Sequence, residues 1–306
     1  MHVEMKSITS HPGMAGRATE EAVRRSKRVA RVKAVASLVL KYLILTVFAF
    51  FFAIPAWWMI TTSLKTLQEV FVYPPTFIPN KIVWSNYPDA LKMIPFMLYL
   101  RNTLIITIPN LAGTLVSSSL AAYGFSRVHW PGRNVVFVVV LSTMMLPYHV
   151  TMIPLYVIFI HGLKWGDTFW PLIVPGLFAN AFDIFLLRQF FMTIPMDLSD
   201  AARIDGCNHA GIYWRIILPL ARPALATVGI FSFLWGWNWF IGPLLYLSRE
   251  RLWTLSLGLQ AYRVSHLVSW NYMMAAATVF TIPIIVLFFF AQRTFIQGIA
   301  MTGIKG

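Results

Sequence analysis

The sequence predicts an all-α membrane protein with six transmembrane helices and both termini in the cytoplasm. Two observations support this fold class. Of the 306 residues, 58% are hydrophobic and 12% are charged, whereas soluble domains average about 45–50% and about 25%. The chain also contains several apolar runs of the length, roughly 20 residues, that a helix needs to cross the hydrocarbon core.

The six predicted spans are separated by polar or proline-marked segments. They cover approximately residues 42 to 64, 99 to 125, 135 to 160, 168 to 191, 223 to 247 and 270 to 292. An even number of spans places both ends of the chain on one side, and that side carries most of the 25 Lys and Arg residues. Because positive charge marks the cytoplasmic side, we expect a multi-pass protein of the cell membrane with cytoplasmic termini.

The chain is expected to divide into a basic cytoplasmic tail, residues 1–41, and a membrane domain, residues 42–306. The tail is expected to be partly disordered, and its end is either a helix lying on anionic lipid headgroups or a solvated run of charge. The net charge of +14 is concentrated in this tail and beside the apolar runs. It therefore indicates membrane orientation and lipid contact, and no nucleic-acid partner is expected.

Prolines and small residues within the spans indicate a packed bundle that lines a pathway. Lipid tolerates a proline break only where neighbouring helices or a water-filled cavity pair the freed backbone groups. The runs "AGTLVSSSLAAYG" and "AAAT" allow close helix approach. Outside the spans, segment 65–98 is predicted to cap the outer side, and segment 248–269 to form a re-entrant or surface-lying helix.

The longest inner loop, residues 195–222, contains the polar stretch "DLSDAARIDGCNHAGIYWRIILPLARP". Pro195 suits the first turn of a helix, and an acidic side chain such as Asp197 favours its positive N-terminal end. Gly206 is a natural stop, since glycine adopts the left-handed cap without steric cost. Ala201 and Ala202 leave one face of this helix open to close approach by another protein. A second short amphipathic helix is predicted to follow.

This loop resembles the cytoplasmic "EAA" loop of ABC importer permeases, with Asp in place of the leading Glu. The spacing is kept throughout the motif, which here consists of Asp200, Ala201, Ala202, Gly206, Ile216, Leu218 and Pro219. Further stretches, among them "SSLAAYGFSRVHWPGR", "LRQFFMTIP" and "QRTFIQGIAMTGIKG", are similar to permeases of carbohydrate importers. The similarity is to the second permease of the maltose-type pair and covers almost the whole chain beyond the tail.

The resemblance implies a type I ABC importer permease fold and several partners. These are a second homologous permease that forms a heterodimer, two ATP-binding cassette subunits that dock on the loop, and an extracytoplasmic solute-binding protein that delivers a carbohydrate. ATP and Mg would bind to the ATPase subunits, because this sequence contains no Walker loop G-x-x-x-x-G-K-[ST]. In the docking loop, which also includes Asp205, Asp200 either meets a basic ATPase residue or is solvated, and Arg203 either meets an acidic one or is solvated.

A few polar side chains inside the spans are candidates for contact with cargo. Asp183 and Asn180 share a helix face at a spacing of three, and Asn238 lies among Trp235, Trp237 and Trp239. Amides and indole rings suit sugar hydroxyls and pyranose faces, but the same residues also suit helix capping, helix association or contact with the partner permease. His149 either lines the pathway or packs. Where the family commonly has Trp-Asn-Glu, this chain has Trp237, Asn238 and Trp239.

Two other classes of membrane protein require features that count against them in this sequence. An ion-coupled transporter or channel needs acidic or histidine relays or an inverted repeat, and a membrane-embedded enzyme needs clustered carboxylates or a metal constellation. The acidic cluster Asp197, Asp200 and Asp205 has no histidine at matching spacing, so neither a metal site nor a catalytic residue is predicted. Cys207 is the single cysteine and excludes an internal disulfide.

Overall fold

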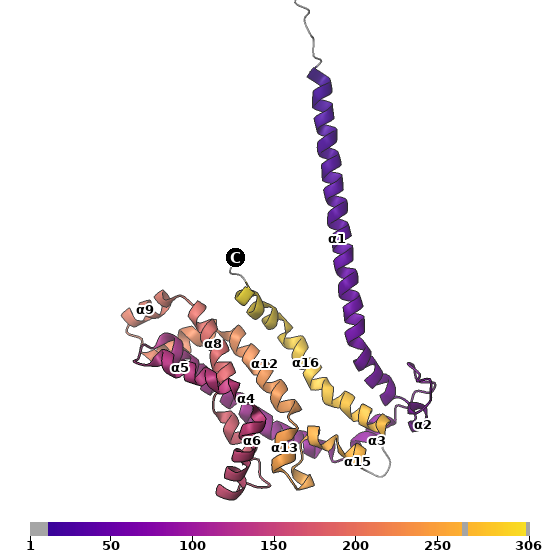
Figure 1. The fold of residues 1–306 in the computed structure, drawn as a ribbon, viewed down its shortest axis with the longest axis vertical. Coiled ribbons are helices and arrows are strands. Elements are labelled where there is room, and N and C mark those ends of the chain that lie inside the picture. Colours follow the sequence, from indigo (N-terminus) through magenta and orange to yellow (C-terminus); the bar gives the residue numbers. More distant parts are fainter. Residues whose placement is uncertain (1–11, 265–268, 304–306) are drawn as a thin grey trace, which may run out of the picture. The chain divides into compact units, whose positions relative to one another are not determined.

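The computed structural model describes residues 12–264 and 269–303, and every element with assigned bounds in these ranges is helical (Figure 1). The chain divides into two compact units at the boundary between Trp58 and Met59.

The first unit is formed by most of helix α1 (Pro12–Ser63). Its segment Ala30–Ser63 is long and apolar enough to cross a membrane. The apolar side chains along this segment are largely exposed, with Phe50 and Phe52 each 73% exposed. The predicted first span therefore begins within a longer helix, which continues without a break into the basic segment that precedes it.

The second unit contains three further spans and two bent helix pairs. The spans are α4 (Phe96–Arg127), the segment Trp170–Thr193 and Trp270–Gln292 within α16 (Trp270–Gly303). The bent pairs join Arg133–Met145 to Tyr148–Gly162 at 93° and His209–Leu220 to Arg222–Asn238 at 78°. The described residues thus contain four candidate spans, or up to six if each bent pair is counted as one span, and the second pair includes residues 209–220 of the predicted inner loop.

The bends and breaks follow from proline chemistry. Pro147 precedes α6 (Tyr148–Val157), and the residue before it, Leu146, is extended because a proline disfavours the helical region for its predecessor. Pro223 occupies the first turn of α12 (Arg222–Asn238), where its missing N–H has no helical partner to lose.

Two predicted spans are corrected by these breaks. The predicted span 135–160 is a bent pair, α5 (Arg133–Ser142) and α6, rather than one helix. The predicted span 223–247 ends at Asn238, and α13 (Ile241–Tyr246) follows after an interruption at Trp239. Both runs are continuously apolar, so hydropathy alone carries no sign of where the backbone turns.

Shorter helices lie between these elements. The segment Trp170–Thr193 is built from α7 (Trp170–Ile173), the 3₁₀ turn η3 (Val174–Leu177) and α8 (Ala181–Thr193). The inner loop contains α9 (Met196–Ile204), α10 (His209–Ile212), the π turn η4 (Tyr213–Ile217) and α11 (Leu218–Leu220). The others are α2 (Leu67–Val70), α3 (Asn86–Met93), η1 (Thr143–Met145), η2 (Ile158–Gly162), η5 (Glu250–Leu252), α14 (Leu255–Gly258) and α15 (Ala261–Val264).

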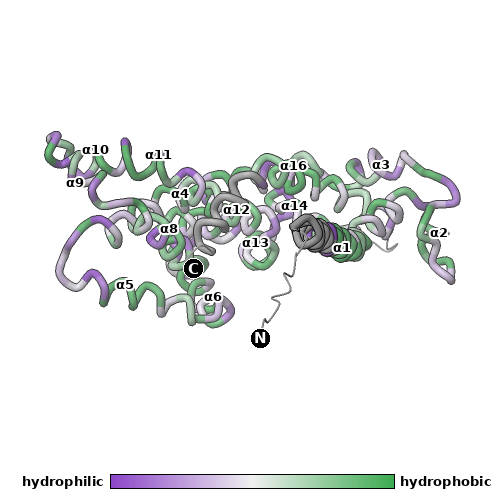
Figure 2. The backbone as a smooth tube through the Cα atoms, turned by 90° about the horizontal axis from the view of Figure 1, so that it is seen from above, coloured by the Kyte–Doolittle hydropathy of each residue, from purple (hydrophilic) through white to green (hydrophobic). Residues whose placement is uncertain are grey.

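Helix α4 runs through the second unit and packs against α8 and α12, while α12 also packs against α16. Figures 1 and 2 show α9 at one end of this unit and α3 at the other. We call these the loop end and the opposite end. A buried cluster at the loop end includes Leu187, Phe191, Ile212 and Ile217. A second cluster at the opposite end includes Tyr99, Trp237, Leu255, Tyr262 and Ala275.

Candidate functional site

A cavity of about 760 Å³ lies among α4, α8, α12 and the segment around η3. Its polar lining comes from amide, hydroxyl, phenol and carboxyl groups of Asn110, Thr114, Tyr148, Asn180, Asp183 and Ser232. Its aromatic lining comes from Phe178, Phe182, Phe231, Trp235 and Trp239. These elements meet here because η3 interrupts the span before α8, which brings the start of α8 to the cavity wall.

Asn180 and Asp183 lie together at the start of α8, as their spacing predicts. Asn180 is the N-cap: its Oδ1 accepts a hydrogen bond from the Asp183 N–H at 2.9 Å, which is the usual way to satisfy a free N–H at a helix start. The Asn180 side-chain amide donates back to the Asp183 carboxylate. Asp183 is 4% exposed, and its negative charge lies at the positive end of the helix.

The cavity lining has the chemistry of a site for a polyhydroxylated molecule. The indoles of Trp235 and Trp239 offer flat apolar surfaces, while the amide of Asn110 and the carboxylate of Asp183 offer hydrogen bonds. Such a combination of apolar walls and few polar groups is typical of small-molecule pockets. Among the lining residues there is no Lys, Arg or His, so this wall of the cavity carries no positive side chain.

Three predicted pathway residues are absent from the cavity lining. Trp237 is 2% exposed, stacks between Phe233 and Phe280, and donates from Nε1 to the Phe280 carbonyl at 3.1 Å. Asn238 is exposed and donates to the Leu234 carbonyl in its own helix. His149 is also exposed, with its ring 5.8 Å from the Tyr148 ring. Trp237 is therefore a core residue, which corrects its assignment to the pathway.

Most lining residues were not predicted, and the polar ones among them are Asn110, Thr114, Tyr148 and Ser232. Asn110 carried a usable signal, since it is an amide inside an apolar run, like Asn180. Its Nδ2 donates to the carbonyls of Ile106 and Leu172 at 2.8 and 2.9 Å. Trp239 is one of the three tryptophans around Asn238 in the sequence, and their alternation does not show which of them faces a cavity.

The inner loop forms the short helix that the sequence predicts. Helix α9 begins after Pro195 and has Asp197 in its first turn. Gly206 has a φ of 82°, the left-handed conformation expected of a glycine stop. The Cys207 N–H then donates to the Ala202 carbonyl at 2.8 Å, which closes the end of the helix.

The two alanines of the loop differ in exposure. Ala201 is exposed, whereas Ala202 is 8% exposed and belongs to the buried cluster at the loop end. Of the two alanines, Ala201 therefore lies on the exposed surface of α9, whereas Ala202 packs against the rest of the second unit. Asp200 and Arg203 form an exposed ion pair at 2.8 Å, and Asp205 is exposed beside them.

The second half of the loop is held against the bundle. Ile212 and Ile217 are fully buried in the loop-end cluster, and Ile216 and Leu218 pack against it. Pro219 lies in α11 and is exposed. Ile216 and Leu218 thus help to anchor the loop, whereas the segment before Gly206 carries an exposed surface that combines charged side chains with Ile204, which is 88% exposed.

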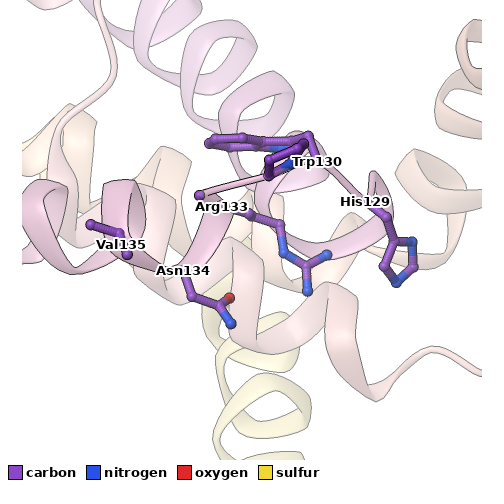
Figure 3. Close-up of a pocket in the computed structure, with 7 residues that line it drawn as sticks. His129, Trp130, Arg133, Asn134 and Val135 are labelled. Carbon is purple, nitrogen blue, oxygen red and sulfur yellow. The ribbon is translucent and has the colours of Figure 1, made fainter.

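A second hollow, of about 540 Å³, lies at the turn between α4 and α5. Figure 3 shows His129, Trp130 and Arg133 there, on the turn and the start of α5. Arg133 Nη1 donates to the Val128 carbonyl at 3.0 Å, so the guanidinium stabilises the turn itself. None of the predicted site residues lines this hollow. Within the described ranges, no group of three or more His, Cys, Asp or Glu side chains is arranged to hold a metal ion.

The helical spans and the partly open, largely apolar cavity with its few polar groups indicate a multi-pass membrane transport subunit. The chain belongs to the family described as binding-protein-dependent transport system inner membrane component, whose model matches residues 113–301. It is thus a non-enzymatic permease subunit of an ABC importer. This membership favours the importer interpretation over an ion-coupled transporter, a channel or a membrane-embedded enzyme.

Relatives and solved structures agree with this family. The chain is 35% identical over 205 residues to the arabinooligosaccharides transport system permease protein AraQ of Halalkalibacterium halodurans, covering 67% of this chain and 73% of that protein. It resembles a chain of a bacterial ABC transporter involved in the import of the acidic polysaccharide alginate, with a TM-score of 0.74, 25% identity, and coverage of 84% and 95%. A structure of a bacterial alginate ABC transporter in complex with an alginate pentasaccharide-bound periplasmic protein matches with a TM-score of 0.60, 16% identity, and coverage of 87% and 94%, which supports the fold alone.

Proposed function

We propose that this permease imports a sugar or oligosaccharide and forms half of the translocation pathway at the cavity between α4, α8 and α12. The observation that carries the proposal is the pairing of indole surfaces, Trp235 and Trp239, with the hydrogen-bonding groups of Asn180 and Asp183 in one cavity. Indoles cover the apolar faces of pyranose rings, while amides and carboxylates bind their hydroxyls. The cargo named for AraQ and that named for the alginate transporter are both saccharides.

The charge of the cavity leads us to propose an uncharged cargo. Asp183 already occupies the positive end of α8, and the lining residues add no cation. An anionic cargo would meet a buried carboxylate here, and like charges in a poorly solvated site repel strongly. This permease's share of the pathway therefore suits neutral saccharides better than uronates.

We further propose that the loop of residues 195–222 docks an ATP-binding cassette subunit, with the loop end in the cytoplasm. The exposed charged and apolar side chains before Gly206 and the buried anchor after it suit a short rigid contact element. The complete importer would contain a second permease, as a heterodimer, two ATPase subunits that bind ATP and Mg, and an external solute-binding protein. Residues 1–41 would form a cytoplasmic tail, and residues 42–306 the permease domain.

Uptake by the complete importer tests the proposal. The chain is co-expressed with its partner permease, the ATPase subunits and the solute-binding protein, and the complex is reconstituted in proteoliposomes. We expect ATP-dependent uptake of neutral oligosaccharides and weaker uptake of matched uronates. Uptake of uronates alone would refute the uncharged cargo, and failure to take up any saccharide would refute the carbohydrate assignment.

The docking surface has its own test. Asp200→Lys reverses a charge on the exposed surface of α9, and Gly206→Val places a β-branched residue at a positive φ. We expect both variants to co-purify with less ATPase than the unaltered chain. Full co-purification and full uptake in both variants would exclude this loop as the docking element.

A further inference from the structure

Helix α4 is hydrogen-bonded by its side chains to three separate parts of the second unit. At its first turns, Asn102 Nδ2 donates to the carbonyls of Arg251 and Trp253 at 3.0 and 2.9 Å. Thr103 Oγ1 accepts from the Leu255 N–H at 2.9 Å. Both side chains are buried. The start of α4 is therefore fixed to the segment 250–255 at the opposite end.

The middle of α4 is fixed to the cavity wall. Asn110 Nδ2 donates to the Leu172 carbonyl at 2.9 Å, and Thr114 Oγ1 donates to the Gly176 carbonyl at 3.1 Å. A Cβ atom at Gly113 would overlap with the backbone of Leu177, so the two segments are in direct contact. Because Asn110 and Thr114 also line the cavity, any displacement of α4 changes the cavity.

The last turns of α4 are fixed to the inner loop on both sides of α9. The Ser119 and Tyr213 hydroxyls are 2.7 Å apart, and the Tyr123 hydroxyl lies 3.1 Å from His209 Nδ1. Arg127 is 1% exposed and donates to the carbonyls at the end of α8, those of Phe191 and Ile194, and to Met196 Sδ in the first turn of α9. These three α4 residues recur every four positions, so they lie on one face of the helix. We call them the loop ladder.

The neighbouring helix α12 has a different pattern. Its side-chain bonds from Thr227 and Asn238 return to carbonyls of its own helix, and the bond from Trp237 reaches α16. In the part of the chain that the structure describes, α12 has no side-chain hydrogen bond to the loop. The loop, the cavity wall and the opposite end are thus joined through α4.

We propose that α4 transmits movement of the α9 loop to the cavity wall and to segment 250–255, and that Ser119, Tyr123 and Arg127 are the positioning residues of this coupling. Because the length of a helix hardly changes, hydrogen bonds at both ends and in the middle of α4 make the inner loop, the cavity wall and segment 250–255 move together. Interhelical hydrogen bonds in membranes contribute about 0.6 kcal/mol each on average. The proposal rests on the docking function of the loop proposed above.

The coupling is tested by removing two hydroxyls from the loop ladder. Ser119→Ala and Tyr123→Phe delete hydroxyls that bond to the loop, and keep the apolar packing. Ser126→Ala is the matched control, since its hydroxyl donates to the carbonyl of Ala122 in α4 itself at 2.7 Å. Each variant is reconstituted in the complete importer, and three quantities are measured: ATPase co-purification, ATP hydrolysis, and cargo moved per ATP hydrolysed.

We expect the cargo moved per ATP to fall about threefold in each single variant and about eightfold in the double variant, which is the effect of bonds of this strength. ATPase co-purification stays unchanged in the variants, and the Ser126→Ala control behaves like the unaltered chain. An unchanged ratio in the double variant would overturn the proposal, and so would an equal fall in the control. Loss of co-purification in the double variant would show that these bonds only maintain the conformation of the loop. That result would also overturn the proposal.

The outcome separates this inference from the docking function on which it rests. Gly206→Val and Asp200→Lys are measured in the same preparation. If both retain full ATPase co-purification, the docking function fails, whatever the loop-ladder variants do. If both lose it while the double variant of the ladder retains coupled transport, the docking function stands and the role of α4 fails.

Discussion

Asn180 and Asp183 bind each other across the first turn of α8, the Asp183 N–H donating to Asn180 Oδ1 and the Asn180 amide donating to the Asp183 carboxylate. The pair couples a helix cap to a buried charge. Asn180→Ala removes the cap, which costs about 1 kcal/mol, and leaves the carboxylate without its side-chain donor, which costs a further 1–3 kcal/mol or so. Asp183→Asn keeps the shape and removes the charge. We expect Asn180→Ala to lower the unfolding temperature in detergent clearly more than Asp183→Asn. The reverse order would show that the charge, not the cap, limits stability here.

Trp235 and Trp237 both lie in α12 but have different roles, which substitutions distinguish. Trp237→Ala empties a buried aromatic site, which costs about 3–5 kcal/mol, so we expect loss of the folded protein. Trp235 is 68% exposed and lines the cavity, so Trp235→Ala should leave the unfolding temperature unchanged and reduce cargo uptake. Thermal unfolding and uptake are measured on the same preparations. A large loss of stability in Trp235→Ala would contradict its placement.

Gly206 is required for its backbone conformation rather than for space. A Cβ at this position would meet nothing within 4 Å, but φ is 82°. Gly206→Ala should cost about 1–2 kcal/mol, the strain of a side chain in the left-handed region, and Gly206→Asn should cost less, because Asn tolerates that region. Gly124 provides the control: it also has open space around its Cβ, but it lies inside α4, where alanine is favoured. Unfolding temperatures of the three variants test the order.

Asp167 joins two loops at the opposite end of the unit. Its carboxylate accepts from the N–H groups of Ser248 and Arg249 at 2.6 and 3.2 Å, and it forms an ion pair with the Arg249 side chain at 3.4 Å. The side chain of Arg249 is 58% exposed, so the ion pair itself contributes only about 0–1 kcal/mol. We expect Asp167→Ala to lower the unfolding temperature and Arg249→Ala to leave it nearly unchanged. Equal losses would assign the stabilisation to the ion pair.

Tyr262 makes the fold sensitive to alkali. Its hydroxyl donates to the Ala90 carbonyl at 2.7 Å, and burial raises the pKa of Tyr262 above its usual value of 10.0. Above that pH the unfolded chain loses this proton while the folded chain keeps it. The stability that is present below pH 10 is therefore lost as the pH rises further. Unfolding temperatures between pH 8 and about pH 11 should fall less in Tyr262→Phe, and Tyr73→Phe, whose ring is 92% exposed, should follow the unaltered chain.

The long elements could be predicted from the sequence because each depends mainly on residues within the element itself. The apolar runs predicted the spans, and Gly206 predicted the end of α9. The bend at Pro147 and the interruption at Trp239 could not be placed, since proline is compatible with a kink, a helix start or a turn, and the surrounding run is apolar in every case. Hydropathy reports burial from water but not the direction of the backbone.

The cavity could be predicted only in part, because some of its side chains interact locally in the sequence and others are placed by distant residues. Asn180 and Asp183 interact locally, at a spacing of three, so their pairing is readable in the sequence. The roles of Trp235 and Trp237 depend on which side of α12 meets α16, which is set by distant residues such as Phe280. The same holds for Ser119, whose regular spacing is visible but whose partner, Tyr213, lies 94 positions away.

Cys207 closes the end of α9 with its backbone, and its half-buried side chain packs against the loop-end cluster. Because it is the single cysteine of the chain, the unaltered protein carries one native attachment point for a thiol-reactive dye or nitroxide, located where α9 passes into α10. A label there would report the local mobility of this junction during turnover. A spectroscopic label can thus be attached at Cys207 without first substituting other cysteines in this subunit.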